Sequence, residues 1–376
     1  MKTRTFEKLG IQTSLLGFGC MRFPTLENGR IDELKAEAML DKAIASGVNY
    51  IDTAYPYHGG ESESFVGKVL KKYQRDQFFL ATKLPVWKIN HKDEVLPIFQ
   101  EQLTKLQVDY VDFYLLHALD EERWDALVEQ GVLDVLDQLK AEGKIKYLGF
   151  SFHDEYPVFE KIIQYRAWDF CQIQYNYVDT EIQAGNKGYI LAEKLGIPLV
   201  IMEPIKGGNL ANLPEDIARF FKAYYPKRSL SSWALRWVGS HKNVKVILSG
   251  MSTMDHVLDN LDTFTNFKAL NQEEYDLVNK VTEIIKSRTK NGCTGCEYCM
   301  PCPHGVNIPR NFKIWNDWAI YHNDEQAHRR YFKDLPADER ADMCQACGAC
   351  EPQCPQSIQI ISDLARVHEE MKLLKA

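Results

Sequence analysis

The chain has 376 residues, of which 45% are hydrophobic and 26% charged, and its formal net charge is -7. This composition is typical of a folded protein and argues against an intrinsically disordered chain. The acidic balance gives no reason to expect nucleic acid or an anionic membrane as a partner. The sequence begins without an apolar leader, and no run reaches the ~18 apolar residues of a membrane-spanning helix, so we expect a cytoplasmic protein.

A short hairpin and eight repeated units make up the first 270 residues. Residues 4–15 have the pattern of a hairpin, which we expect to close the floor of the structure that follows. Eight short apolar runs come next, and such runs are typical of buried parallel strands. They occupy residues 15–21, 49–54, 78–84, 111–117, 146–151, 170–176, 198–204 and 244–250.

The stretches between these runs are amphipathic or capped, as expected of helices. Eight strand–helix units in about 250 residues are what a (β/α)8 TIM barrel requires. A doubly wound sheet is the alternative architecture. It is weakened because residues 17–22, GFGCMR, supply only the first two glycines of the G-x-G-x-x-G fingerprint. We therefore predict an α/β protein with a TIM barrel.

A further helix and a change in composition mark the end of the barrel. Residues 271–290 are predicted to form a helix that starts with a capping box between Asn271 and Glu274. Cys, Pro and Gly dominate beyond it, so we predict two domains, residues 1–288 and residues 289–376. In the second domain Phe312, Trp315 and Trp318 are spaced for one helix face and are expected to form its core.

Four ionisable residues fall where barrel strands end. Asp52 closes the second strand, Tyr57 lies in the loop after it, Lys83 closes the third strand and His117 closes the fourth. Taken singly, a helix cap, an exposed charge or a core histidine would explain them. Because TIM-barrel active sites are built at the carboxyl ends of the strands, their convergence on one rim predicts an active site.

The chemistry of these groups suggests a role for each. A tyrosine hydroxyl titrates near ~10, and a neighbouring ammonium lowers that pKa toward the working range of an acid. Lys83 is expected to act on Tyr57 in this way, and Asp52 to hold Lys83 charged. His117 is expected to orient a carbonyl oxygen. The site suits reduction of a carbonyl or oxidation of an alcohol.

At this point the chain resembles the aldo-keto reductase family, whose Asp, Tyr, Lys and His tetrad matches these four residues. The resemblance covers residues 1 to about 270 and includes the motif D-T-A-x-x-Y, residues 52–57. It implies a (β/α)8 barrel that binds NADP(H) or NAD(H) without a Rossmann motif and transfers hydride to aldehydes or ketones.

The resemblance also implies a set of nucleotide-binding residues. Ser151 and Gln172 fall where the family binds the nicotinamide carboxamide, and residues 250–260 resemble the segment that holds the adenosine end. The expected contacts in that segment are Gly250, Ser252, His256 and Asn260.

Three departures affect the expected cofactor. Phe152 and Met202 stand where the family commonly has asparagine and the stacking tyrosine. Residues 250–260 also contain no Lys or Arg to meet a 2′-phosphate, so Lys206 is predicted to supply that charge from another loop. A flavin stays open as an alternative cofactor.

Eight of the ten cysteines lie within residues 293–354, in two runs. Cys344, Cys347, Cys350 and Cys354 are followed by proline, which is the C-x2-C-x2-C-x3-C-P run of bacterial ferredoxins. Cys293, Cys296, Cys299 and Cys302 form the same run with a last gap one residue shorter. Zinc is the alternative, because four thiolates also make a zinc site. The double pattern favours two [4Fe–4S] clusters.

In two-cluster ferredoxins the fourth cysteine of each run ligates the other cluster. One cluster is therefore predicted on Cys293, Cys296, Cys299 and Cys354, and the other on Cys344, Cys347, Cys350 and Cys302. The shorter gap before Cys302 leaves open that the first run closes on its own iron. The tail resembles all-helical ferredoxins, so we expect a small, mainly helical ferredoxin-like domain.

These observations predict an iron–sulfur oxidoreductase that interconverts a carbonyl and an alcohol and exchanges electrons with a redox-protein partner. Hydride carries two electrons and a cluster carries one, and no residue in the sequence converts between them. The alternative is a nucleotide-sensing or docking barrel with an electron-transfer tail and little reductase activity.

Overall fold

The computed structural model describes residues 1–293, 295, 297–354 and 357–374. A two-stranded antiparallel sheet, β1 (Thr3–Phe6) and β2 (Ile11–Ser14), precedes a closed barrel of eight parallel strands. The barrel strands are β3 (Leu16–Gly19), β4 (Tyr50–Asp52), β5 (Phe79–Leu84), β6 (Val111–Leu119), β7 (Ile145–Phe152), β8 (Phe170–Gln174), β9 (Leu199–Met202) and β10 (Val244–Ser249). The predicted TIM barrel and all eight predicted strands are confirmed.

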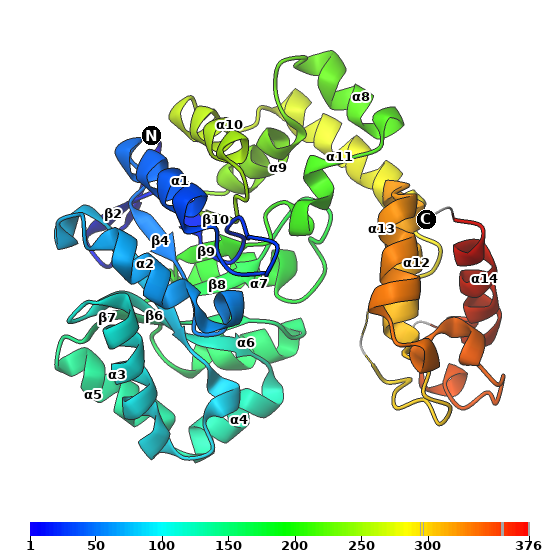
Figure 1. Cartoon of the computed structure of the whole chain (residues 1–376), viewed down its shortest axis with the longest axis horizontal. Helices are drawn as coiled ribbons and strands as arrows, with labels where there is room; N and C mark the ends of the chain where they lie inside the picture. The colour runs from blue at the N-terminus through cyan, green and yellow to red at the C-terminus, as the bar shows by residue number, and fades with distance from the viewer. Residues whose placement is uncertain (294, 296, 355–356, 375–376) are drawn as a thin grey trace. The chain divides into compact units, whose positions relative to one another are not determined.

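The barrel strands follow one another in chain order, and β10 closes the ring against β3. Helices surround the strands in Figure 1. Those of the barrel are α1 (Glu33–Ala45), α2 (Ser62–Leu70), α3 (Val95–Leu106), α4 (Glu121–Glu129), α5 (Val132–Ala141), α6 (Tyr156–Tyr165), α7 (Gly185–Leu195), α9 (Leu230–Gly239) and α10 (Met254–Thr265). Both faces of each strand are thus covered, which explains why the strand sequences are almost continuously apolar.

The N-terminal hairpin closes the floor of the barrel. Phe6 on β1 is fully buried, and its ring lies 5.6 Å from that of Phe113 inside the barrel. Phe113 packs in turn against Tyr50 and Phe170, at centroid distances of 4.9 Å each. The predicted hairpin and its place are confirmed. With the floor filled by aromatic rings, the carboxyl ends of the strands are the open side of the barrel.

Helix α11 (Gln272–Ser287) begins with the predicted capping box. The Asn271 side chain accepts a bond from the Glu274 amide at 2.9 Å, and Glu274 accepts one from the Asn271 amide at 3.0 Å. The Glu274 carboxylate also lies 2.7 Å from the guanidinium of Arg236 on α9, and each of these two side chains is only 2% exposed. The start of α11 is therefore fixed by a buried ion pair.

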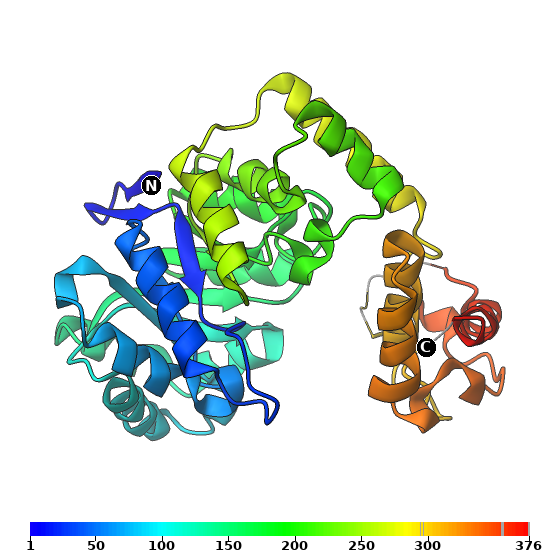
Figure 2. The ribbon, with the colours of Figure 1, turned by 45° about the horizontal axis from the view of Figure 1, so that its top comes forward.

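The chain divides into two compact units: residues 1–211 with 228–275, and residues 212–227 with 276–376. Helix α8 (Glu215–Tyr224) belongs to the second unit and runs alongside α11 in both views (Figures 1 and 2). The ammonium of Lys280 on α11 lies 4.6 Å from the ring of Phe220 on α8. The units do not follow chain order, so the domain boundary near residue 288 stays a prediction.

The cysteine-rich part of the second unit is mainly helical, as expected. It contains α12 (Ile308–Tyr321), α13 (Asp324–Arg329) and α14 (Ile360–Lys372), with short 3-10 and π-helical segments between α13 and α14. Phe312 and Trp315 are buried in its core and Trp318 packs against it, so the predicted aromatic face is confirmed. The indole of Trp315 donates to Glu370 at 2.9 Å, which joins α12 to α14.

Among the helices that the structure describes, none combines the length and the apolar composition needed to cross a membrane.

Candidate active site and cluster-binding pocket

A buried lysine and a buried aspartate form the centre of the predicted site. Lys83, next to the end of β5, is fully buried, and Asp52, the last residue of β4, is 2% exposed. The ammonium donates to Oδ1 of Asp52 and to the backbone carbonyl of Thr53, each at 2.7 Å. A buried ammonium needs such partners, because an unpaired charge in the interior is very costly. The lysine is thus held in one position.

Tyr57 and His117 lie beside this pair. The Lys83 ammonium is 5.0 Å from the centre of the Tyr57 ring, and the rings of Tyr57 and His117 are 6.0 Å apart in an edge-to-face arrangement. Nδ1 of His117 and Oδ2 of Asp52 are buried and have no hydrogen-bond partner among the described residues. The structure therefore brings all four predicted residues together at the open end of the barrel.

Burial dominates the proton affinities of the site. It raises the pKa of Tyr57, and although the Lys83 charge acts in the opposite direction, the pKa stays above its usual value. The prediction that Lys83 brings the Tyr57 pKa down toward neutrality is therefore wrong for this structure. Burial also raises the pKa of Asp52, against the lowering effect of Lys83. Tyr57 remains a protonated hydroxyl, which is the form of an acid.

The pKa shifts leave Lys83 charged and His117 neutral. Burial acts to lower the pKa of Lys83, but Asp52 and Tyr57 outweigh it, so this pKa is raised and the ammonium persists. Burial, followed by the positive charge of Lys83, holds the pKa of His117 well below its usual value. A neutral imidazole can donate one hydrogen bond to an oxygen without adding a charge to the site.

Ser151 and Gln172, the two residues predicted to bind the nicotinamide carboxamide, differ in their hydrogen bonds. The Ser151 hydroxyl, on β7, accepts a bond from the Ala118 amide at 2.7 Å. Gln172, on β8, is 2% exposed; its Nε2 points to the sulfur of Met202 at 3.3 Å, and its Oε1 has no partner among the described residues. A buried oxygen without a partner can accept a hydrogen bond from the amide group of a ligand.

Residues 250–260, which are expected to bind the adenosine end of the nucleotide, form hydrogen bonds within the segment and with Ser249. The Asn260 amide donates to the Ser249 hydroxyl at 2.7 Å, and Asn260 is 4% exposed. Nδ1 of His256 accepts from the Ser252 amide at 3.4 Å. Gly250 and Ser252 lie in the connection from β10 to α10, and His256 and Asn260 lie on α10 itself.

Lys206 does not offer a free charge to this segment. Its ammonium lies 2.6 and 2.7 Å from the two carboxylate oxygens of Asp179, which is buried. Asn176 also donates to Asp179, at 3.1 Å. The prediction that Lys206 meets a 2′-phosphate has no support in this geometry, because the carboxylate already neutralises it.

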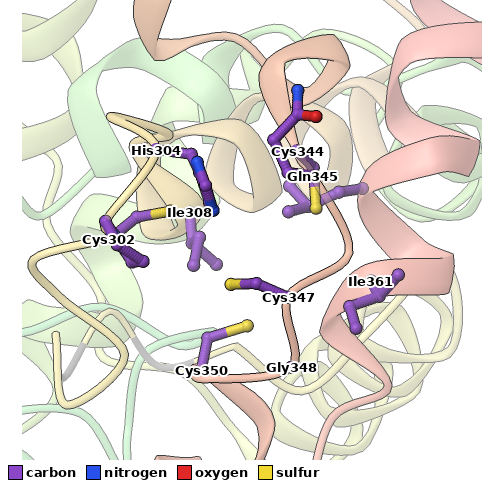
Figure 3. A pocket seen from close by; sticks show the side chains of 11 residues that line it. Cys302, His304, Ile308, Cys344, Gln345, Cys347, Gly348, Cys350 and Ile361 are labelled. Carbon is purple, nitrogen blue, oxygen red and sulfur yellow. The ribbon is translucent and has the colours of Figure 1, made fainter.

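In the tail, four cysteines of the predicted second set line one pocket. Cys302, Cys344, Cys347 and Cys350 surround it with the apolar side chains of Ile308, Ile361 and Leu364. Figure 3 shows the sulfur atoms of Cys302, Cys347 and Cys350 turned into the same space. Four thiols around an apolar pocket are a donor set that fits an iron–sulfur cluster.

The other predicted set is described only in part. Cys293, Cys299 and Cys354 are partly buried against the core of the tail. Cys296 and the proline at 355 lie outside the described residues. Cys354 is not among the residues around the Cys344 pocket, although it belongs to the same run. The fourth cysteine that lines the Cys344 pocket is thus Cys302 and not Cys354.

Comparison with known protein families shows which family the chain belongs to. A model of the aldo/keto reductase family matches residues 15–283. The chain belongs to the aldo/keto reductase family. A model of the 4Fe-4S dicluster domain matches residues 292–361, which contain all eight clustered cysteines. The protein is thus an aldo/keto reductase family oxidoreductase with a ferredoxin-type dicluster domain.

Several named proteins are similar in sequence to the barrel part of this chain. A probable aldo-keto reductase of Glycine max is 29% identical over 216 residues, 53% of this chain and 58% of that protein. The L-galactose dehydrogenase of Arabidopsis thaliana is 25% identical over 77% of this chain and 97% of its own length. The NADH-specific methylglyoxal reductase of Escherichia coli is 26% identical over 68% of this chain and 89% of its own length.

Solved structures show the same barrel. The holo form of an aldo-keto reductase from Bacillus halodurans superposes with a TM-score of 0.64 at 28% identity and covers 75% of this chain and 96% of its own. An aldo-keto reductase of Klebsiella pneumoniae, solved with NADPH, gives 0.62 at 22% identity over 75% and 96% of the two chains. The second likeness concerns the fold alone.

Some residues around the tetrad of this aldo/keto reductase were not predicted. The ring of Trp87 lies 5.1 Å from that of His117, and the Thr53 carbonyl is the second acceptor of Lys83. Gln102 on α3 donates to the Lys83 carbonyl at 3.0 Å and to buried Glu63 on α2 at 2.6 Å. Trp87 follows Lys83 closely in the sequence and could have been proposed, whereas the Gln102 contacts depend on packing that the sequence does not display.

Proposed function

We propose that the protein interconverts a carbonyl and an alcohol with a nicotinamide nucleotide at the tetrad, and carries two [4Fe–4S] clusters in its tail. The observation that carries the first part is the fully buried Lys83, bonded to Asp52 at 2.7 Å and placed against Tyr57. A buried cation beside a protonated phenol is an arrangement expected at a site of proton transfer.

Each residue has a distinct task in carbonyl reduction. Tyr57 donates its proton to the carbonyl oxygen, and Lys83 stabilises the phenolate that remains. Asp52 keeps Lys83 charged and in place, and neutral His117 orients the carbonyl oxygen by a hydrogen bond. When bound, the nicotinamide would supply the hydride, and Gln172 and Ser151 would hold its carboxamide.

The choice between NADH and NADPH belongs to the proposal. One relative is named as NADH-specific, and one structure of the same fold contains NADPH. Neither the family model nor the relatives point to a flavin. We therefore propose a nicotinamide nucleotide as the cofactor of the barrel.

The cluster ligands follow the crossed arrangement. Cys344, Cys347 and Cys350 would hold one cluster together with Cys302, and the shared pocket of these four thiols supports that set. Cys293, Cys296, Cys299 and Cys354 would hold the other. The clusters would exchange single electrons with a redox-protein partner, while the barrel moves a hydride.

A second candidate, a nucleotide-sensing barrel with an electron-transfer tail, is favoured by the altered carboxamide site. The Ser151 hydroxyl is already bonded within the chain, and Met202 contacts Gln172 where the family commonly has a stacking tyrosine. A sensor has no need of a buried ammonium beside a phenol, so the tetrad favours the enzyme.

Metal and cofactor analysis of protein purified without oxygen tests the cofactor content. We expect a brown protein with about eight irons per chain, a matching amount of sulfide and little zinc. Stoichiometric zinc with negligible sulfide would contradict the clusters. A stoichiometric flavin released on denaturation would contradict the nicotinamide as sole organic cofactor.

A further inference from the structure

Arg22, at the open end of the barrel, occupies the space that a side chain at residue 250 would need. β3 and β10 are paired neighbours, and Arg22 and Gly250 follow their carboxyl ends. A Cβ atom at residue 250 would lie 2.7 Å from Cγ and 3.0 Å from Cβ of Arg22. Real Cβ atoms do not come so close, so the Arg22 stem fits over residue 250 only because that residue is glycine.

The charge of Arg22 has no acidic partner in the described part of the chain. Its side chain is exposed, and in the described part of the protein no carboxylate oxygen lies within 4.0 Å of its guanidinium. Two other cations in the loops are paired: Arg30 with Glu61 at 2.8 Å, and Lys206 with Asp179 at 2.6 Å. An arginine without a carboxylate, next to the adenosine segment, is free to bind an anion.

The position of Arg22 also places its charge near the tetrad. His58 directly follows Tyr57, and its Nε2 accepts a hydrogen bond from the backbone amide of Phe23, the residue after Arg22, at 3.2 Å. Arg22 thus lies beside the loop of the catalytic tyrosine as well as beside residue 250. A dinucleotide that spans from the tetrad to residues 250–260 would pass between these two points.

The adenosine segment does not contain a cation to meet the phosphates. Residues 250–260 contain no Lys or Arg, and Lys206 is bound to Asp179. Arginine is the side chain best suited to phosphate, because its planar fork donates two parallel hydrogen bonds.

We propose that Arg22 binds a phosphate group of the nicotinamide nucleotide, and that Gly250 is glycine to let Arg22 reach it. This inference rests on the proposed function, because it names the residue that holds the nucleotide at the same site. Arg22 supplies from the β3 end the positive charge that the α10 segment does not contain.

Calorimetric binding of NADPH and of NADH to the full chain tests the proposal. Arg22→Gln should weaken binding about 10- to 100-fold, as expected for loss of a hydrogen bond to a charged group. Arg22→Lys should recover part of the affinity, and Gly250→Ala should weaken binding although it removes no charge. Arg30→Gln is the matched control and should bind as the wild type does.

The two nucleotides distinguish which phosphate is bound. An equal loss with both indicates the pyrophosphate, which they share, and a loss confined to NADPH indicates the 2′-phosphate. Wild-type affinity in both Arg22→Gln and Gly250→Ala would overturn the inference while leaving the nucleotide site intact. A wild-type protein that binds neither nucleotide would contradict the proposed function itself, and this inference with it.

Discussion

Lys83 and Asp52 form a buried ion pair, with Nζ and Oδ1 2.7 Å apart and both side chains at most 2% exposed. Each comes from a different barrel strand, so the pair exists only when β4 and β5 are correctly paired. Burying two charges is expensive unless their remaining donors are satisfied, and the Thr53 carbonyl satisfies one donor of Lys83. We interpret this arrangement as catalytic and derive the following predictions from it and its surroundings.

Lys83→Met should reduce carbonyl turnover by about 10²- to 10⁴-fold and leave the iron content unchanged. The phenolate of Tyr57 loses its counterion, while Asp52, whose pKa burial already raises, can take up a proton. Steady-state kinetics and iron analysis on the same preparation check this. Lys88→Met removes an exposed lysine of the next loop and serves as the control. Near-normal turnover of Lys83→Met would refute the assigned roles.

The rate of carbonyl reduction should be level from about pH 6 to pH 9 and fall only at more alkaline pH. Reduction requires protonated Tyr57, and burial raises its pKa above the usual value, so the proton is lost late. The pKa of His117 is held well below its usual value, so the imidazole stays neutral throughout this range. The pH profile of kcat/KM measures this. An inflection near pH 6.5 that disappears in His117→Asn would contradict it.

Cys302→Ala should damage the cluster of the Cys344 run and not that of the Cys293 run. The reason is that Cys302 lines the same pocket as Cys344, Cys347 and Cys350. The electron paramagnetic resonance spectrum of Cys302→Ala should therefore resemble that of Cys347→Ala.

Cys299→Ala is the reference for the other cluster, and Cys354→Ala should resemble it. A Cys302→Ala spectrum that instead matches Cys299→Ala would show that the first run closes on its own iron. Iron analysis of all four variants should show each retaining about half of its iron, since one four-iron cluster remains.

Glu274→Ala should destabilise the barrel by about 3–5 kcal/mol, because it leaves the guanidinium of Arg236 buried without its counterion. The substitution also removes half of the capping box at the start of α11. Chemical denaturation followed by circular dichroism measures the change. Glu283→Ala, at an exposed position of the same helix, should stay within about 0.5 kcal/mol of wild type. Equal stability of the two variants would contradict the importance of the pair.

The barrel could be predicted from the sequence because local pattern determines it. Each strand is an apolar run, and each neighbouring helix has its own start and stop signals, such as Gly196, which ends α7 with a left-handed φ of 65°. The tetrad was also predictable, since residues at successive strand ends must meet on one rim of a barrel. The Asn271–Glu274 capping box depends on residues of one turn, and it too was found.

What the sequence did not display depends on contacts between distant segments. Lys206 was predicted to supply the charge for a 2′-phosphate, and its ion pair with Asp179, on the loop after another strand, is such a contact. The pKa of Tyr57 was expected to fall because the sequence shows its charged neighbour but not how deeply it is buried. The contact between Arg22 and Gly250 joins opposite ends of the barrel sequence and could not be seen from local pattern.

The most direct test of the central claim is the reduction of a panel of aldehydes with NADPH or NADH. It compares wild type, Tyr57→Phe and Tyr55→Phe, each prepared with full iron content. The Tyr55 hydroxyl bonds to Glu101 at 3.2 Å, outside the tetrad, so its loss is the matched control. The account predicts turnover by wild type and Tyr55→Phe, and a loss of about 10²- to 10⁴-fold in Tyr57→Phe with nucleotide affinity unchanged. Equal turnover by Tyr57→Phe and wild type, or wild-type protein that binds nucleotide and reduces no aldehyde, would contradict it.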